Sequence, residues 1–275
     1  MLISLCNEVL AEHDFARQCE LARQLGYDGL EIAPFTLSSE PHRLPQERRS
    51  EIRRIAADHG IAITGLHYLL RAPDGLSITT RDRDLRQRTI GVIRHLIELA
   101  HDLDAGIIVH GSPAQRRLEP GHASDGRLFA IECWSSIAGD AASAGVTYCI
   151  EPLAHQEADF INTVEEAAGI VRAIGNDAIR TMIDCSAAAR AESQPIPDLI
   201  RQWMPSGLIA HIHLNDPNRR GPGEGELGFA PILAALRESG YAGHASVEPF
   251  IYIPDGATCA ARAIGYVQGS MQSAR

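Results

Sequence analysis

The fold is decided by the stretch His211-Ile212-His213-Leu214-Asn215-Asp216-Pro217-Asn218-Arg219-Arg220-Gly221-Pro222-Gly223-Glu224-Gly225. It begins as a β-strand, because apolar and polar residues alternate from Ile209 to Leu214 with the period-two pattern of a pleated segment. It continues into a loop, because its proline and glycine residues interrupt both helix and sheet. A strand that ends on a His, followed by a loop with Asn, Asp and Arg, is typical of the rim of an active site.

The rest of the chain repeats this unit of a short strand followed by a helix. Short apolar segments predict seven more strands, at residues 2–6, 29–32, 61–69, 106–110, 146–150, 179–183 and 245–247. Apolar residues at helical spacing predict eight helices, at residues 14–25, 45–59, 82–103, 125–144, 163–174, 196–204 and 229–238 and from about residue 258. The alternation recurs at intervals of about 30 residues, the length of a βαβ unit.

Eight strands that alternate with eight helices predict an α/β fold, a single (β/α)8 TIM barrel that forms one domain over residues 1–275. Several strands are apolar throughout, as expected for strands buried on both faces. A doubly wound open sheet is the alternative, and it usually has a glycine-rich phosphate-binding turn after its first strand. Here that turn is Asn7-Glu8-Val9-Leu10, which contains no glycine.

Composition limits the possible classes of function. The 275 residues are 45% hydrophobic and 22% charged with a formal net charge of -10, and an acidic surface repels nucleic acid. No apolar run approaches the about 20 residues that span a membrane, and residues 1–8 lack the basic start of a signal peptide. The six Cys residues are scattered without a C-x-x-C pair. We therefore expect a cytoplasmic protein with reduced thiols, no membrane association and no nucleic-acid partner.

Four polar residues stand at the ends of four consecutive predicted strands: Glu151, Asp184, His213 and Glu248. The C-terminal ends of the strands of such a barrel converge on one mouth, so these residues form an arc around it. Oxygen ligands favour Mn²⁺ or Mg²⁺, and the imidazole shifts the preference toward Mn²⁺, Co²⁺ or Zn²⁺. Without a cation, three carboxylates in one cleft would raise each other's pKa. One such residue alone is more often a cap or a salt bridge, but four at equivalent places predict a metal site.

Other polar residues near the mouth each allow two interpretations. His67 and His110 also reach it, and contact with substrate and packing stay equally open. His211 has the same parity as His213, so it points into the barrel one layer deeper, as a core residue or as a support for the ligands. Glu31 ends a strand, where it either hydrogen-bonds a neighbouring His or makes a salt bridge at the rim. The two Arg at 116–117 are interpreted as part of a solvated face.

Several motifs together give the chain a family resemblance. They are Ile150-Glu151-Pro152-Leu153, Asn162-Thr163, Ile183-Asp184, His213-Leu214-Asn215-Asp216-Pro217-Asn218-Arg219, Pro222-Gly223-Glu224-Gly225 and Val247-Glu248-Pro249. With these motifs the chain resembles the xylose isomerase-like barrel superfamily, the sugar phosphate isomerase/epimerase group, over nearly its whole length. Within this group it is most similar to the branch of D-tagatose 3-epimerases and D-psicose 3-epimerases.

The resemblance implies a metal-dependent sugar isomerase or epimerase that moves a proton next to a carbonyl through an enediolate. The implied ligands of one divalent ion, with Mn²⁺ favoured, are Glu151, Asp184, His213 and Glu248. Glu151 and Glu248 would also be the acid/base pair. Glu157 and Arg219 match substrate-contacting positions of the family. We add His67 and His110 to them as candidate substrate contacts. The expected partner is a small carbohydrate, and the dimers and tetramers of the family lead us to expect a homo-oligomer.

One position departs from the branch. The epimerases have a substrate-contacting His three residues after the strand-six Asp, where this chain has Ala187. The ligand set remains, so a second hypothesis changes only the outcome: a dehydratase or other lyase of a keto-sugar, inosose or 3-dehydroshikimate-like substrate. A third hypothesis is an apurinic endonuclease of the same superfamily. It is disfavoured because this chain lacks the additional His and Asp ligands of those enzymes and carries a negative net charge, which repels nucleic acid. A barrel that only binds sugar or acts as a scaffold is disfavoured because the ligand set is intact.

Overall fold

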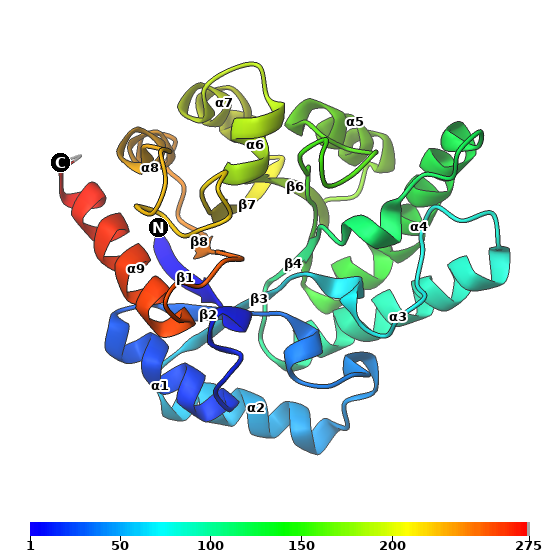
Figure 1. The fold of residues 1–275 in the computed structure, drawn as a ribbon. Coiled ribbons are helices and arrows are strands. Elements are labelled where there is room, and N and C mark those ends of the chain that lie inside the picture. The colour runs from blue at the N-terminus through cyan, green and yellow to red at the C-terminus, as the bar shows by residue number, and fades with distance from the viewer. Residues whose placement is uncertain (274–275) are drawn as a thin grey trace.

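The strands close into a parallel barrel in a computed structural model that describes residues 1–273 (Figure 1). They are β1 (Leu2–Cys6), β2 (Gly29–Ile32), β3 (Ala62–Leu66), β4 (Ile107–His110), β5 (Thr147–Ile150), β6 (Ile179–Asp184), β7 (Ile209–Leu214) and β8 (His244–Val247). Each strand pairs in parallel with the next along the chain, and β8 pairs with β1. The predicted (β/α)8 TIM barrel is confirmed, and closure excludes the open doubly wound sheet.

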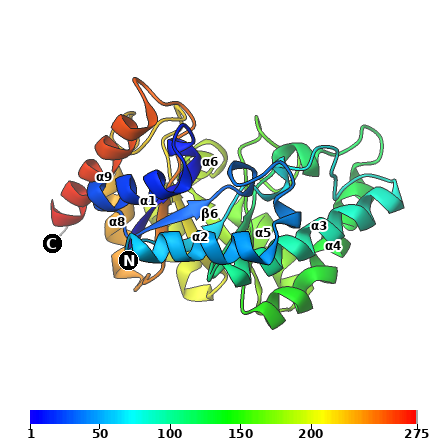
Figure 2. The same cartoon turned by 90° about the horizontal axis from the view of Figure 1, so that it is seen from below.

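The α-helices surround the barrel (Figure 1), as the apolar stripes in their sequences predict. Within residues 1–273 they are α1 (Phe15–Leu25), α2 (Gln46–Asp58), α3 (Arg83–Asp102), α4 (Ala123–Ala144), α5 (Val164–Ile174), α6 (Cys185–Ala191), α7 (Ile196–Trp203), α8 (Phe229–Glu238) and α9 (Gly256–Ser273). The view turned by 90° shows the N-terminus at one end of the barrel and the loop between β8 and α9 at the other end (Figure 2). Among these helices none has both the length and the apolar character that crossing a membrane requires.

Short-range chemistry sets many ends of these elements. α1 begins after Asp14, whose side chain accepts a hydrogen bond from the main-chain N–H of Arg17 at 2.9 Å. It ends at Gly26, whose φ of 94° lies in the left-handed region that glycine adopts without strain. Thr163 caps α5 in the same way, by accepting from the main-chain N–H of Glu166. Because such signals are local, β1, β2, β7 and α8 have their predicted bounds.

Two predictions about the elements are wrong. The third strand ends at Leu66 rather than at residue 69, so His67 lies just beyond it. Within residues 1–273 there is also a ninth α-helix, because α6 starts directly after Asp184, where we predicted no helix. Three consecutive Ala residues favour a helix there, and the Asp184 carboxylate caps its start by accepting from Ala187 N at 2.6 Å.

The interior of the barrel changes from apolar to polar toward the strand ends. Val109, Cys149 and Met182 form a small buried cluster separate from the main core between strands and helices. Two residues further along the chain from Cys149 and Met182 are Glu151, directly after β5, and Asp184, the last residue of β6, and both are buried. Because side chains two residues apart lie on the same face of a strand, the layer of carboxylates lies directly above the apolar layer.

We expect Asp14→Ala to lower the free energy of unfolding by about 1 kcal/mol, because it removes the capping oxygen of α1. Asp14→Asn is the matched control, since Asn caps a helix about as well as Asp. Urea denaturation followed by circular dichroism measures both. Equal stability of Asp14→Ala and the wild type would show that this cap contributes nothing to folding.

Candidate metal and active site

Four side chains meet at the mouth of the barrel. One ligand atom from each of Glu151, Asp184, His213 and Glu248 lies within 4.8 Å of the others, and all four residues are buried. His213 Nδ1 is 3.0 Å from Glu248 Oε2, 3.5 Å from Glu151 Oε1 and 3.9 Å from Asp184 Oδ2. One imidazole nitrogen therefore faces three carboxylates.

The register of the barrel explains this convergence. Asp184 is the last residue of β6 and is paired with His213 of β7. His213 is in turn paired with Ser246 of β8, so Glu248 follows two residues later on the same face of its strand. Residues that are distant in sequence thus reach one level of the barrel because adjacent parallel strands end side by side.

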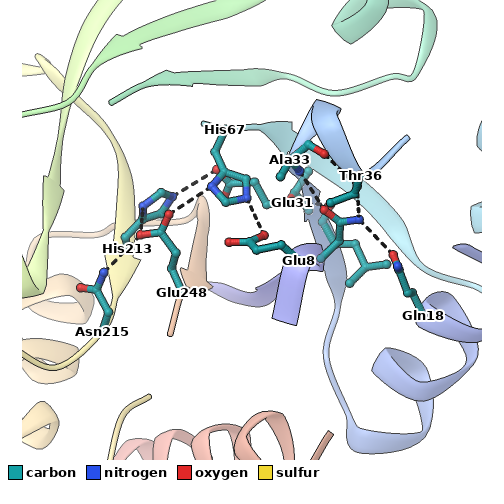
Figure 3. A network of polar contacts seen from close by, with 12 residues as sticks. Glu8, Gln18, Glu31, Ala33, Thr36, His67, His213, Asn215 and Glu248 are labelled. Carbon is teal, nitrogen blue, oxygen red and sulfur yellow. Dashed lines mark hydrogen bonds and ion pairs between the residues drawn. The ribbon is translucent and has the colours of Figure 1, made fainter. Parts of the chain in front are cut away.

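The orientation of His213 is fixed from the opposite side of the barrel. Its Nε2 donates to Glu31 Oε1 at 3.1 Å, and Glu31 Oε2 accepts from His211 Nε2 at 2.7 Å (Figure 3 shows Glu31 beside His213). Glu31 is fully buried, and although burial alone would raise its pKa, His211 and His213 hold it well below the ordinary value. A carboxylate behind a ligating imidazole fixes its tautomer, and here it leaves Nδ1 directed at the carboxylates.

The cluster fits a divalent cation. Within residues 1–273 the buried Nδ1 of His213 has no partner in hydrogen-bond geometry, although three carboxylates surround it. Burial, and then the charges of Glu151 and Glu248, raise the pKa of Asp184 well above its ordinary value. This repulsion disappears when a cation occupies the centre, and nitrogen with carboxylate oxygen suits a divalent ion of intermediate hardness.

Asn215 organises two of the carboxylates, which the sequence pattern did not reveal. Its Nδ2 donates to Asp184 Oδ2 at 2.6 Å and to Glu248 Oε2 at 3.1 Å. Its Oδ1 accepts from the main-chain N–H of Ser186 at 2.8 Å, and the residue is buried. An amide that donates to two carboxylates holds them together without adding charge. The signal available in the sequence was its place two residues after His213 in the quoted stretch.

His67 supports Glu248 from behind. Its Nδ1 lies 3.1 Å from Glu248 Oε1 and its Nε2 lies 2.9 Å from Glu8 Oε2, as Figure 3 shows. Burial alone would lower the pKa of His67, but Glu8 and Glu248 raise it well above the ordinary value. For Glu248, burial alone would raise the pKa, but His213 and His67 lower it to about 2. His67 is not among the described residues that line the cavity, so its observed role is to hold a carboxylate.

A cavity of about 230 Å³ lies over the carboxylates. Its volume is below that of pockets for drug-sized ligands, so it suits a small molecule. Its wall combines aromatic rings, small residues and charged groups, among them Tyr68, Gly111, Ser112, Glu157, Ser186, Arg219 and Phe250. An aromatic and polar wall above a cluster of carboxylates can bind a polyhydroxylated molecule, because rings cover its C–H faces and polar groups bind its hydroxyls.

Glu157 and Arg219, the two residues expected to contact substrate, both line this cavity. Glu157 Oε1 accepts from Arg190 Nη1 of α6 at 3.1 Å. The Arg219 guanidinium lies over the Phe250 ring at 5.0 Å, and its carbonyl accepts from Phe250 N at 2.9 Å and from Ile251 N at 3.0 Å. The loops after β7 and β8 therefore hold each other at the rim.

His110 lies elsewhere. Its Nδ1 accepts from Trp134 Nε1 at 3.1 Å and from the Tyr148 hydroxyl at 2.7 Å, and the ring is fully buried outside the cavity lining that the described residues form. Burial, followed by the charge of Arg116, lowers the pKa of His110 to about 3, so the imidazole is neutral. Of the two interpretations of His110, the structure favours packing against α4.

The interpretation of Arg116 as solvated is wrong, because this side chain is fully buried.

We expect Glu31→Gln to weaken Mn²⁺ binding by about 10- to 100-fold, because the amide can no longer accept from both imidazoles. Isothermal titration calorimetry with Mn²⁺ measures the affinity without any substrate. Glu132→Gln, an exposed carboxylate on α4, is the control that should bind like the wild type. An unchanged affinity of Glu31→Gln would separate Glu31 from the metal site.

The sequence of the chain is similar to those of known barrel proteins. The model of the xylose isomerase-like TIM barrel family matches residues 19–267. A D-psicose 3-epimerase of Enterocloster bolteae is 26% identical over 242 residues, which cover 86% of this chain and 77% of that protein. An inosose isomerase of Halalkalibacterium halodurans is 25% identical over 250 residues, with coverages of 88% and 84%.

The fold has a solved counterpart as well. A crystal structure of a D-psicose 3-epimerase in the presence of D-fructose superposes with a TM-score of 0.82 at 22% identity, over 98% of this chain and 99% of that one. At this identity the likeness shows the fold alone, whereas the family model covers most of the sequence. The chain therefore belongs to the xylose isomerase-like TIM barrel family.

Proposed function

We propose that the chain is a divalent-metal-dependent ketose 3-epimerase, which moves a proton at the carbon beside the carbonyl of a small ketose. The observation that carries this proposal is the buried set of three carboxylates and one imidazole nitrogen directly beneath a small cavity. Relatives named D-psicose 3-epimerase and inosose isomerase support an isomerase in preference to the dehydratase that Ala187 left open.

The residues that would hold the metal are Glu151, Asp184, His213 and Glu248. A bound divalent ion would supply Lewis acidity, which makes the C–H between a carbonyl and a hydroxyl group easier to ionise. Among divalent ions we favour Mn²⁺, because the donor set mixes carboxylate oxygens with one imidazole nitrogen.

The proton transfers are assigned to Glu151 and Glu248. They follow directly after β5 and β8, the two ends of the arc of four strands, and both line the cavity. One carboxylate takes the proton from the substrate carbon and the other returns one to the opposite face. His67 and Asn215 both donate to Glu248, which keeps its carboxylate in one orientation while the substrate turns over.

The substrate would be oriented by Glu157 and Arg219 across the cavity. The Arg219 guanidinium carries several donors for hydroxyl oxygens, and the Phe250 ring beneath it keeps it in place. Because Ala187 has no side chain that can hydrogen-bond, any contact that a His would make at this position is absent, which changes the set of preferred ketoses.

We expect Glu151→Gln and Glu248→Gln each to lower solvent proton exchange by about 100-fold or more, the contribution of a general acid or base. The Mn²⁺-loaded protein is incubated in D₂O with a panel of ketoses, and proton NMR follows the C–H signal beside the carbonyl. Calorimetry on the same variants checks that Mn²⁺ still binds, since Gln keeps one ligand oxygen. The exposed Glu132→Gln is the control with wild-type exchange.

Inversion at the carbon next to the carbonyl is the expected product. A product that has lost water would identify a dehydratase instead, and exchange that persists in both variants would contradict the assigned roles.

We expect Arg219→Ala to raise KM by about 10-fold or more with a smaller change in kcat, because a charge-assisted hydrogen bond to substrate is lost in the ground state and the transition state alike. Steady-state kinetics with the best ketose of the panel measures both constants. Arg53→Ala, an exposed Arg on α2, is the matched control. A fall in kcat at unchanged KM would assign Arg219 to the chemical step instead.

A further inference from the structure

Arg116 is buried in a way that a charged side chain rarely is. It ends the 3₁₀ turn Pro113–Arg116 after β4, and its exposed fraction is 0%. Its Nη1 donates to the main-chain carbonyl of Glu151 at 2.6 Å. Within residues 1–273 its Nε and Nη2 have no hydrogen-bond partner. Burial of a guanidinium with one hydrogen bond to a neutral acceptor destabilises a fold, so stability alone does not account for this residue.

The segment from His110 to Arg116 contacts Glu151 at its main-chain N–H, at its main-chain carbonyl and at its side chain. The carbonyl of His110, at the start of the segment, accepts from Glu151 N at 3.2 Å. Arg116, at its end, donates to Glu151 O. Between them is Gly111, where a Cβ atom would collide with the Glu151 carboxylate. The seven consecutive residues from His110, the last residue of β4, to Arg116 thus contact both main-chain polar groups of Glu151 and limit the position of its side chain.

Contact with substrate is not the explanation for Arg116. The residues of the described chain that line the cavity include Gly111 and Glu151 but not Arg116. The arginine near substrate is Arg219, while Arg190 is bound to Glu157 at the rim. Arg116 therefore reaches the site through Glu151, by its hydrogen bond to the main-chain carbonyl and by the attraction between its charge and the carboxylate.

We propose that Arg116 is a positioning residue, which fixes the main chain at Glu151 so that its carboxylate lies over Gly111 and faces His213 Nδ1. The proposal rests on the function assigned to Glu151 above. A guanidinium suits this task because it is long enough to reach the carbonyl from the next loop and stays charged, which strengthens its hydrogen bond. Glu151 follows β5 directly, so its main-chain carbonyl stands just beyond the strand, where the Arg116 guanidinium donates to it.

The test compares Arg116→Met and Arg116→Lys with Arg117→Met, the adjacent exposed Arg whose side chain should not matter. In Arg116→Met we expect the Kd for Mn²⁺ to rise by about 10- to 100-fold, the usual effect of losing a group that orients a ligand. At saturating Mn²⁺ we expect kcat to fall by about 10- to 100-fold while KM changes little, because the acid/base carboxylate is displaced and the cavity wall is not. Arg116→Lys retains a charged donor and should lie between Arg116→Met and the wild type in both quantities.

Thermal unfolding separates positioning from a general structural role. We expect Arg116→Met to unfold cooperatively with a Tm equal to or above that of the wild type, because a buried charge is replaced by an apolar side chain. Loss of the cooperative transition would show that Arg116 holds the fold itself and would overturn the proposal. So would an unchanged Mn²⁺ affinity and kcat in Arg116→Met. A wild-type protein that binds no Mn²⁺ would instead overturn the proposed function, and this inference with it.

Discussion

The site depends on one electrostatic constraint, the burial of three carboxylates around the same imidazole nitrogen of His213. Like charges this close in a space of low dielectric constant repel, and a cation at the centre of the cluster would remove this repulsion. The surroundings satisfy the outer faces of the cluster: Glu31 accepts from the imidazole, and Asn215 donates to two carboxylates. The inner faces of the carboxylates and the imidazole remain directed at one point, an arrangement that could hold one divalent cation.

The closed barrel brings these charged side chains together and holds them in place. Adjacent parallel strands carry their last residues to one level, so ligands from β5 to β8 meet although their loops are long. The strand ends hold the cluster of carboxylates and imidazole, and the loops hold Glu157 and Arg219 in the cavity wall above it. Arg116 and Gly111 add a third device, in which one loop shapes the main chain and side chain at the end of the neighbouring strand.

The sequence predicted the barrel and the residues that now meet at its mouth, because a short apolar segment that ends on a polar residue is readable in a window of a few residues. The sequence was much less informative about whether a side chain points into the barrel or away from it. His110 follows Ile107, Ile108 and Val109, a run without polar alternation, so nothing local indicates that its ring packs outward on Trp134. The burial of Arg116 was equally invisible, since an arginine in a polar loop is most often solvated.

The sequence by itself determined the alternation of strands and helices, their caps and the presence of a carboxylate or an imidazole at each of four consecutive strand ends, because propensity and capping act over a few residues. Only the tertiary structure decided which groups hydrogen-bond to those four side chains. Glu31 meets His213 across 182 residues of chain, and His67 meets Glu248 across 181. Such pairs form across the barrel, and a shift of one residue in the register of either strand would turn one side chain to the other face. That register is set by closure of all eight strands together, which no local segment encodes.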